Sequence, residues 1–372
     1  MIMQTKIVKV TEDIKSDKYL YEEAGQILRD GGLVAFPTET VYGLGGNGLD
    51  SNASRKIYAA KGRPSDNPLI LHIADVEMLY DIAQNINEKA ERLIKAFWPG
   101  PLTMVFCKAE KVPFETTGGL ESVAVRMPSH PVAAAMIRAA GVPVAAPSAN
   151  ISGRPSPTLA KHVAEDMAGR IEMIIDGGNI DIGIESTIVD MTSEPPVILR
   201  PGYVTKEMLE AVIGEVSLDP TLLIKPTEDL RPKAPGMKYR HYAPKAELTL
   251  YEGEIKKVTE TIFEEMLKKV KQGKRVAVIA TEESKLIYDG LLSEAAHDVN
   301  GKPAEKDCEF IMLGSRRDEE SIARNLYAAL RECDEKQVDY IYSETFSLDN
   351  FGQAIMNRLR KAAGYNIINL ND

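Results

Sequence analysis

The sequence predicts an α/β protein with two domains, a larger one built on a twisted mixed sheet and a smaller one built on a parallel, doubly wound sheet. In residues 1–214, strand-like and helix-like segments mix without strict alternation, which favours a mixed sheet. From residue 246 onward, strands and helices alternate, as in doubly wound domains. Residues 215–245 contain Pro and Lys and show weak periodicity. We interpret them as a linker between domains 1–214 and 246–372.

Composition argues against nucleic-acid-binding, membrane, zinc-ribbon and disulfide-rich proteins. The net charge of -10 argues against broad, nonspecific nucleic-acid binding, which needs a basic face. No apolar run approaches the roughly 20 residues of a membrane span, and the N-terminal segment lacks the apolar core of a signal peptide. The three cysteines lie far apart, which supports neither a zinc ribbon nor a disulfide framework. We therefore expect a cytoplasmic protein with free thiols and no membrane partner.

The first elements follow from apolar periodicity. Alternation predicts a strand over residues 7–10, and a single apolar stripe predicts a helix over about 17–30 that ends at Gly31 and Gly32. The apolar run 33–36 stops at Pro37, so a second strand is expected to end there. Three hydroxyl side chains follow, those of Thr38, Thr40 and Tyr42. Glycines at 43, 45, 46 and 48 are expected to let the backbone curl with its N–H groups turned inward.

Polar and cationic residues continue as far as the next strand. Asp50 or Ser51 is expected to cap a helix that Gly62 ends. A loop then leads to a strand over 69–73, and it carries Lys61, Arg63, Ser65 and Asn67. Strand ends and loops that present hydroxyls, amides and cations suit a polyphosphate and a small polar substrate.

The remaining elements come from caps and breakers. Asp75 and Asn87 are expected to cap two helices, and WPGPLT ends the second. The other expected strands of the first domain cover 104–107, 121–127, 142–146, 171–175, 185–191 and 197–202, and its other helices cover 130–140, 159–167 and 205–213. In the second domain, strands are expected over 247–251, 275–280, 309–314 and 339–344, and helices over 254–271, 319–332 and 352–363, with one further helix between residues 280 and 309.

Two nucleotide motifs are set aside. GLGGNG at 43–48 fits G-x-G-x-x-G, but six residues separate it from the preceding strand, and a lone glycine-rich run is more simply a tight turn. The two GK pairs, at 273 and 301, are followed by Arg and Pro, so no Walker A motif is present. An ATP site would have to be of another type.

Two strand-end arginines carry more weight. Arg126 and Arg200 each follow an apolar strand, and such an arginine is a natural bidentate partner for a carboxylate or phosphate. Simpler interpretations exist for Lys61 and Arg63 as solvated charges, for His72 as a hydrogen-bonded core residue, and for the serines of 148–156 as an ordinary polar loop. The sequence shows neither a Ser–His–Asp or Cys–His set nor a metal-ligand spacing. It indicates catalysis by positioning and electrostatic stabilisation.

Seven motifs together resemble a known family. They are FPTETVYGLG, KGRPSDNPLILH, WPGPLT, VAVRMPSH, APSANISGRPSPT, ESTIVD and LRPG, in this order over about residues 7–205. The set resembles the L-threonylcarbamoyladenylate synthase family, whose catalytic unit is the YrdC-type domain, and APGMKYRHYAP with the α/β tail resembles its long, two-domain form. The resemblance implies a YrdC-like first domain, a Rossmann-like second domain, and a reaction that joins L-threonine, bicarbonate and ATP into threonylcarbamoyl-AMP, releasing pyrophosphate. It also implies Mg²⁺ with the ATP, and a downstream transferase complex that modifies tRNA.

The resemblance also implies roles for individual residues. Threonine would be held by Thr40, His72, Arg126, Ala146 and Ser186, with Arg126 pairing its carboxylate. Lys61 and Arg63 would face the phosphates and act in catalysis. The implied ATP contacts are Arg63, Asn67, Ser122, Ser148, Asn150, Ser156 and Arg200, with Tyr239 and His241 in a segment, 238–241, that is expected to close over the site as a lid. One hollow that excludes water would then hold a carboxylate beside a triphosphate.

Two other hypotheses remain open at this stage. A cationic cleft would also serve an RNA-binding module in ribosome or tRNA handling, although the net charge of -10 and the lack of a Lys/Arg stripe with aromatics oppose it. Carbamoyl transfer to a different acceptor would share the same fold.

Overall fold

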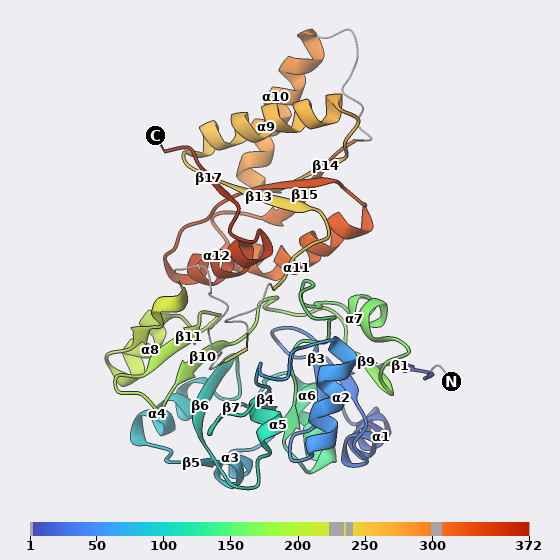
Figure 1. The fold of residues 1–372 in the computed structure, drawn as a ribbon, viewed down its shortest axis with the longest axis vertical. Coiled ribbons are helices and arrows are strands. Elements are labelled where there is room, and N and C mark those ends of the chain that lie inside the picture. Colours follow the sequence, from blue (N-terminus) through green and yellow to red (C-terminus); the bar gives the residue numbers. More distant parts are fainter. Residues whose placement is uncertain (1–2, 223–233, 236–240, 299–306, 372) are drawn as a thin grey trace. The chain divides into compact units, whose positions relative to one another are not determined.

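The computed structural model describes residues 3–222, 234–235, 241–298 and 307–371 (Figure 1). The chain divides into two compact units, one formed by the described residues of 1–152 and 156–239, the other by those of 153–155 and 240–372. Each unit contains its own sheet, so the predicted α/β class with two sheets is confirmed. None of the helices in the described ranges is long and apolar enough to cross a membrane.

The first unit is built on a mixed sheet. Its order is β1-β9-β2-β3-β8-β4-β7-β6-β10-β11-β12, with β5 paired to β6, and parallel and antiparallel neighbours occur throughout. The strands are β1 (Lys6–Lys9), β2 (Val34–Phe36), β3 (Gly43–Asn47), β4 (Ile70–His72), β5 (Ala83–Gln84), β6 (Leu102–Lys108), β7 (Ser122–Arg126), β8 (Val144–Ala145), β9 (Met173–Asp176), β10 (Thr187–Asp190), β11 (Val197–Arg200) and β12 (Ser217–Leu218).

The helices of the first unit begin and end close to where capping chemistry predicts. The Asp50 side chain accepts from Asn52 N at 2.8 Å, and Gly62 ends the same helix in the left-handed conformation, at φ 61°. Asn87 accepts from Ala90 N at 2.9 Å. The helices are α1 (Lys18–Arg29), α2 (Ser51–Lys61), α3 (Glu77–Ile82), α4 (Glu88–Phe97), α5 (Phe114–Thr117), α6 (Pro131–Ala140), α7 (Ala160–Met167) and α8 (Lys206–Ile213), and a 3₁₀ turn spans Pro220–Leu222.

The glycine run 43–48 corrects one prediction. Residues 43–47 form β3, which pairs antiparallel with β2 and β8, so the run is not a curled loop with N–H groups turned inward. The glycines are needed because neighbours pack closely against this segment. A Cβ on Gly45 would lie 2.8 Å from Val144 Cγ1, and one on Gly48, directly after the strand, would clash with Leu71 Cδ2.

The interpretation of 215–245 as one continuous linker is too broad. Residues 217–218 form β12, which pairs with β11 and extends the sheet. Ala234 is fully buried in a small apolar cluster of the first unit that includes Ile70, Ala124 and Ile188. The fold therefore incorporates parts of this segment, because apolar side chains there find partners on the sheet.

The second unit confirms the prediction of a doubly wound domain. Its strands are all parallel in the order β15-β14-β16-β13-β17, and Figure 1 shows α9 and α10 on one face with α11 and α12 on the other. The sequence did not indicate β17. The strands are β13 (Glu247–Glu252), β14 (Val276–Thr281), β15 (Cys308–Gly314), β16 (Tyr340–Glu344) and β17 (Ile367–Asn369), and the helices are α9 (Ile255–Lys271), α10 (Glu282–Asp298), α11 (Glu319–Glu335) and α12 (Asn350–Ala362).

Candidate active site

Arg126 ends β7 and lies at the centre of the candidate site. The sheet register pairs it with His72 on β4 and with Thr103 on β6, so the three side chains share one face. Arg126 is only 4% exposed. Its Nε donates to Gly100 O at 3.3 Å, and its Nη1 donates to Thr40 Oγ1 at 2.8 Å. A buried guanidinium in this position can bind a carboxylate or a phosphate.

Glu39 is a site residue that the sequence analysis missed. Its Oε1 lies 2.8 Å from Arg126 Nη2, and both side chains are buried. Burial alone would raise the pKa of Glu39, but the charge of Arg126 and nearby backbone N–H groups outweigh burial and lower the pKa below its ordinary value. Glu39 is therefore ionised. The available signal was a carboxylate between Pro37 and Val41, in a run of residues that are otherwise apolar or hydroxylated.

His72 is neutral in this environment. It is buried, and one ring nitrogen, Nδ1, lies 3.2 Å from the carbonyl oxygen of Ile70. Burial, followed by the positive charge of Arg126, lowers the pKa of His72 to about 3. The ring can contribute hydrogen bonds and shape beside Arg126, but no positive charge. Its contact with Ile70 agrees with the simpler interpretation as a core histidine, and its register with Arg126 places it at the site as well.

Ser186 connects the second arginine to this face. Its Oγ lies 2.8 Å from Thr103 Oγ1 and accepts from Arg200 Nη2 at 3.2 Å. Arg200 Nε also donates to the carbonyl of Ser186 at 3.1 Å, and Arg200 is 5% exposed. Both strand-end arginines therefore point inward, and Thr103, which the sequence did not single out, lies between them.

Lys61 and Arg63 are buried rather than solvated. Lys61 is the last residue of α2, not part of the following loop, and its Nζ donates to the carbonyls of Ser148 and of Asn150, the latter at 2.6 Å. Arg63 donates from Nε to Asn67 O at 3.3 Å and from Nη2 to Pro68 O at 3.1 Å. The interpretation as surface charges is wrong for both.

The loops around these cations bring together the other predicted contacts. Ser148 donates to Asn150 Oδ1 at 2.5 Å, and it also forms a bridge with Gly43 at the start of β3. Ala146 N donates to Ile70 O at 2.9 Å, next to His72. Ser156 donates to Glu185 Oε1 at 2.7 Å.

The side-chain oxygen of Asn67 is buried and accepts no hydrogen bond from the described residues. The residue is 2% exposed, and its Oδ1 has no partner among the described residues. Since buried polar atoms are normally satisfied, this atom marks a place where a ligand donor fits.

Of the other predicted residues, Ser122 lies on the strand of Arg126, whereas Tyr239 and His241 lie outside the described part of the first unit. Ser122 begins β7, four residues before Arg126, and the parallel pairing of Ile70 with Ala124 places it level with Pro68, the residue after Asn67. Tyr239, with Lys238 and Arg240 of the expected lid, lies outside the described residues. His241 belongs to the second unit, where its ring centroid is 5.4 Å from that of Tyr242. Their contacts with ATP stay predictions.

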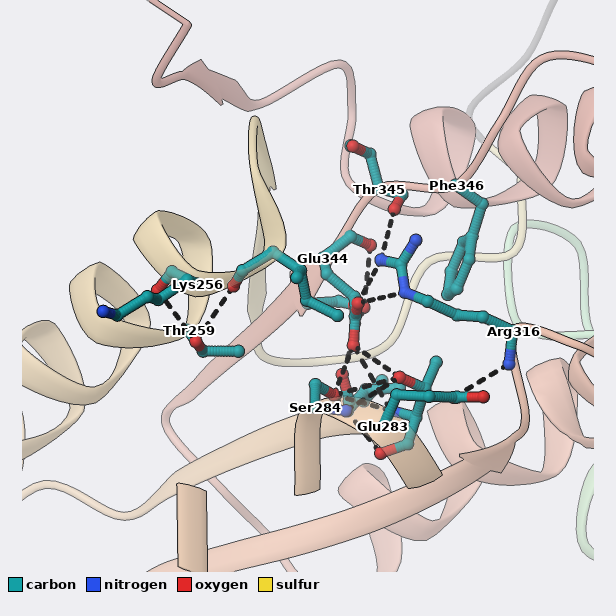
Figure 2. A network of polar contacts seen from close by, with 12 residues as sticks. Lys256, Thr259, Glu283, Ser284, Arg316, Glu344, Thr345 and Phe346 are labelled. Atoms are coloured by element: carbon teal, nitrogen blue, oxygen red, sulfur yellow. Dashed lines mark hydrogen bonds and ion pairs between the residues drawn. The ribbon is translucent and has the colours of Figure 1, made fainter. Parts of the chain in front are cut away.

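The second unit has a polar cluster of its own at the carboxyl ends of its strands (Figure 2). Glu344 is 3% exposed and accepts from Ser284 Oγ at 2.5 Å, from Thr281 Oγ1 at 3.2 Å and from Arg316 Nε at 2.8 Å. Glu283 accepts from the backbone N–H of Arg316 at 2.9 Å. These groups satisfy one another and tie together the ends of β14, β15 and β16. We interpret the cluster as a structural junction.

Comparison with known proteins identifies the family. A family model described as "Telomere recombination" matches residues 26–202, and one described as "Threonylcarbamoyl-AMP synthase, C-terminal domain" matches residues 204–364. The chain is 50% identical to the threonylcarbamoyl-AMP synthase of Pyrococcus abyssi over 98% of this chain and 99% of that one. It is 47% identical to that of Bacillus subtilis, over 98% of this chain and all of the relative.

This chain belongs to the threonylcarbamoyl-AMP synthase family. The resemblance seen in the motifs is confirmed, and with it the expectation of an enzyme. A crystal structure of P. abyssi Sua5 complexed with L-threonine, from the same synthase family, superimposes with a TM-score of 0.88 at 49% identity, over 99% of this chain and 100% of that one. In this synthase family fold, the buried arginines and the glycine strand described above belong to the first unit.

Proposed function

We propose that this chain forms threonylcarbamoyl-AMP, pyrophosphate and water from L-threonine, bicarbonate and ATP. One observation carries the proposal: a hydrogen-bonded pair of hydroxyls links the surroundings of two buried arginines. Arg200 donates to Ser186, Ser186 is hydrogen-bonded to Thr103, and Thr103 is the cross-strand neighbour of Arg126. A carboxylate at Arg126 and a phosphate at Arg200 would therefore lie side by side, as the joining of their groups requires.

The threonine subsite surrounds Arg126. The guanidinium pairs the substrate carboxylate, while Thr40, His72, Ala146 and Ser186 complete the pocket. Support comes from the burial of these residues and from the relative that was solved with L-threonine. Because Arg126 is buried, its interaction with a carboxylate is screened little by water.

The nucleotide subsite continues from Ser186 to the loops. Lys61 and Arg63 turn from backbone carbonyls to the phosphates and stabilise the charge that develops as pyrophosphate leaves. The further ATP contacts are Asn67, Ser122, Ser148, Asn150, Ser156 and Arg200. The unsatisfied oxygen of Asn67 supports its place in this set.

We expect Mg²⁺ to enter with the ATP and to neutralise phosphate charge. Among the described residues, no group of three or more His, Cys, Asp or Glu side chains could hold a metal ion. Phosphate oxygens and water would therefore supply the ligands, as is common for Mg²⁺. A separate transferase complex in the cytoplasm would then pass the threonylcarbamoyl group to the adenosine beside the anticodon of certain tRNAs.

Mass spectrometry of the nucleotide products tests the proposal. With ATP and Mg²⁺, we expect threonylcarbamoyl-AMP and pyrophosphate only when threonine and bicarbonate are both present. A carbamoyl adenylate that forms equally well when another amine replaces threonine would indicate a different acceptor. RNA retained at rising salt, with no nucleotide product, would favour the binding module instead.

A further inference from the structure

We infer that Glu39 receives the α-ammonium group of the amino acid whose carboxylate Arg126 binds. This inference rests on the proposed function. Glu39 is 6% exposed and Arg126 is 4% exposed, and 2.8 Å separates Glu39 Oε1 from Arg126 Nη2. The pair is thus a positive and a negative group held next to each other, away from water.

Hydrogen-bonding capacity is left over on both partners. Arg126 donates from Nε to Gly100 and from Nη1 to Thr40, which leaves N–H groups on Nη1 and Nη2. Glu39 is held by its ion pair with Arg126 Nη2 and by nearby backbone N–H groups of Glu39 and Ser129. Apart from these contacts, neither its carboxylate oxygens nor Arg126 Nη2 have a hydrogen-bond partner of good geometry within the described part of the chain. Buried groups of this kind are normally satisfied, so the geometry points to a ligand that supplies an acceptor for Arg126 and a donor for Glu39.

Charge balance selects the kind of ligand. A carboxylate bound to Arg126 would lie close to the carboxylate of Glu39, and two like charges that share one buried guanidinium repel each other. An α-amino acid carries an ammonium on the carbon next to its carboxylate, so one zwitterion presents both charges that the pair needs. Binding a zwitterion leaves the net charge of the pocket unchanged. A simple carboxylic acid would add one uncompensated negative charge.

No other described group beside Arg126 offers a negative charge to the ammonium group. His72 is neutral and already near the Ile70 carbonyl, and Thr40 accepts from Arg126. His130 also interacts with the charge of Glu39. Burial lowers the pKa of His130, so its ring is neutral and does not balance the charge of the carboxylate. Glu39 is therefore the ionised acceptor that the described structure places beside Arg126.

The test compares threonine with its analogue 2,3-dihydroxybutanoate, in which a hydroxyl replaces the ammonium, by calorimetric titration of the full chain with ATP and Mg²⁺ present. Wild-type protein should prefer threonine by roughly 10- to 100-fold, as expected for a charge-assisted hydrogen bond. Glu39→Gln should lose most of that preference by weakening threonine while leaving the analogue unchanged or bound more tightly. The control Asp190→Asn removes another buried carboxylate, whose side-chain hydrogen bonds among the described residues go to Thr192 and Ser193 of its own turn, and should keep the wild-type preference.

Three outcomes would overturn the inference. The first is wild-type protein that binds the analogue as tightly as threonine. This result needs no variant, so it holds even if Glu39→Gln does not fold. A Glu39→Gln variant that weakens both ligands equally would show that Glu39 only orients Arg126. A variant that keeps the full preference would exclude the role altogether. Failure of wild-type protein to bind threonine at all would instead contradict the proposed function.

Discussion

Arg126 gives the most direct test of the site at the scale of single residues. Arg126→Ala removes the group proposed to hold the substrate carboxylate, and charge-assisted hydrogen bonds contribute about 1.5–3 kcal/mol. We expect kcat/KM for threonine to fall roughly 10- to 150-fold, by steady-state assay of pyrophosphate release. Arg55→Ala is the control, because that side chain is 54% exposed and pairs with Glu115 at the surface. Equal losses in both variants would contradict the assignment.

His72 should make the stability of the fold depend on pH. Its folded pKa of about 3 lies below the ordinary value of 6.5, so the unfolded chain binds more protons between these values. The free energy of unfolding should therefore fall as pH drops from about 6.5 towards 3, by at most about 1.4 kcal/mol per pH unit from this residue. Urea unfolding at several pH values would measure it. His72→Gln lacks the titrating ring, and its slope should be shallower. Parallel curves for the two proteins would exclude the effect.

At the scale of elements, β3 fits between its neighbours because three of its five residues are glycines. Gly45→Ala would place a Cβ 2.8 Å from Val144 Cγ1 and 3.0 Å from Phe36 Cε1, so we expect a loss of about 1–3 kcal/mol in unfolding free energy from overpacking. Gly290→Ala is the matched control. That glycine lies within α10 with nothing within 4 Å of an added Cβ, and the change should stabilise by roughly 0.5–1 kcal/mol. Chemical denaturation measures the unfolding free energy of both variants. A change in the same direction for both would contradict the packing argument.

Elements could be predicted from sequence where the cause is local. The caps at Asp50 and Asn87, and the αL glycine at position 62, act within a few residues of their own helix, and the structure reproduces all three. β3 could not be predicted, because the reason for its glycines is the bulk of Phe36 and Val144, which lie on the neighbouring strands β2 and β8. Its local composition is that of a turn, and tertiary packing overrides that preference.

The same difference between local and distant causes decides which site residues could be predicted. Arg126 and Arg200 were visible because a cation at the end of an apolar strand is a local pattern. Thr103 was not visible, since only the register of β6 with β7 brings it beside Arg126. Glu39 was not predicted for a related reason. Its role depends on an ion pair with Arg126, which lies far along the chain, and the sequence around Glu39 shows only neighbouring hydroxyls.

On the scale of the whole molecule, the two units have separate cores. The second core gathers side chains from β13, β14, β16, α9 and α10, and Glu344 joins the strand ends nearby. Removing one partner of a buried ion pair costs roughly 3–5 kcal/mol, and we expect Glu344→Ala to fall at the low end, because the Arg316 side chain is 32% exposed.

Scanning calorimetry should therefore resolve two transitions. Glu344→Ala should lower the melting temperature of one, whereas threonine with ATP should raise that of the other, since ligands stabilise the unit that binds them. A single transition that both changes move together would show that the units unfold as one. In that case the two cores would not be independent in stability.

The hydroxyl of Ser186 has a thermodynamic consequence. It has one proton to give, and it already meets both Thr103 and a nitrogen of Arg200. An amino acid that reorients this hydroxyl changes the hydrogen bond that it offers to the nucleotide. A nucleotide that reorients it changes the hydrogen bond offered to the amino acid. Linkage then requires reciprocity: by whatever factor the first ligand changes the affinity for the second, the second changes the affinity for the first by the same factor.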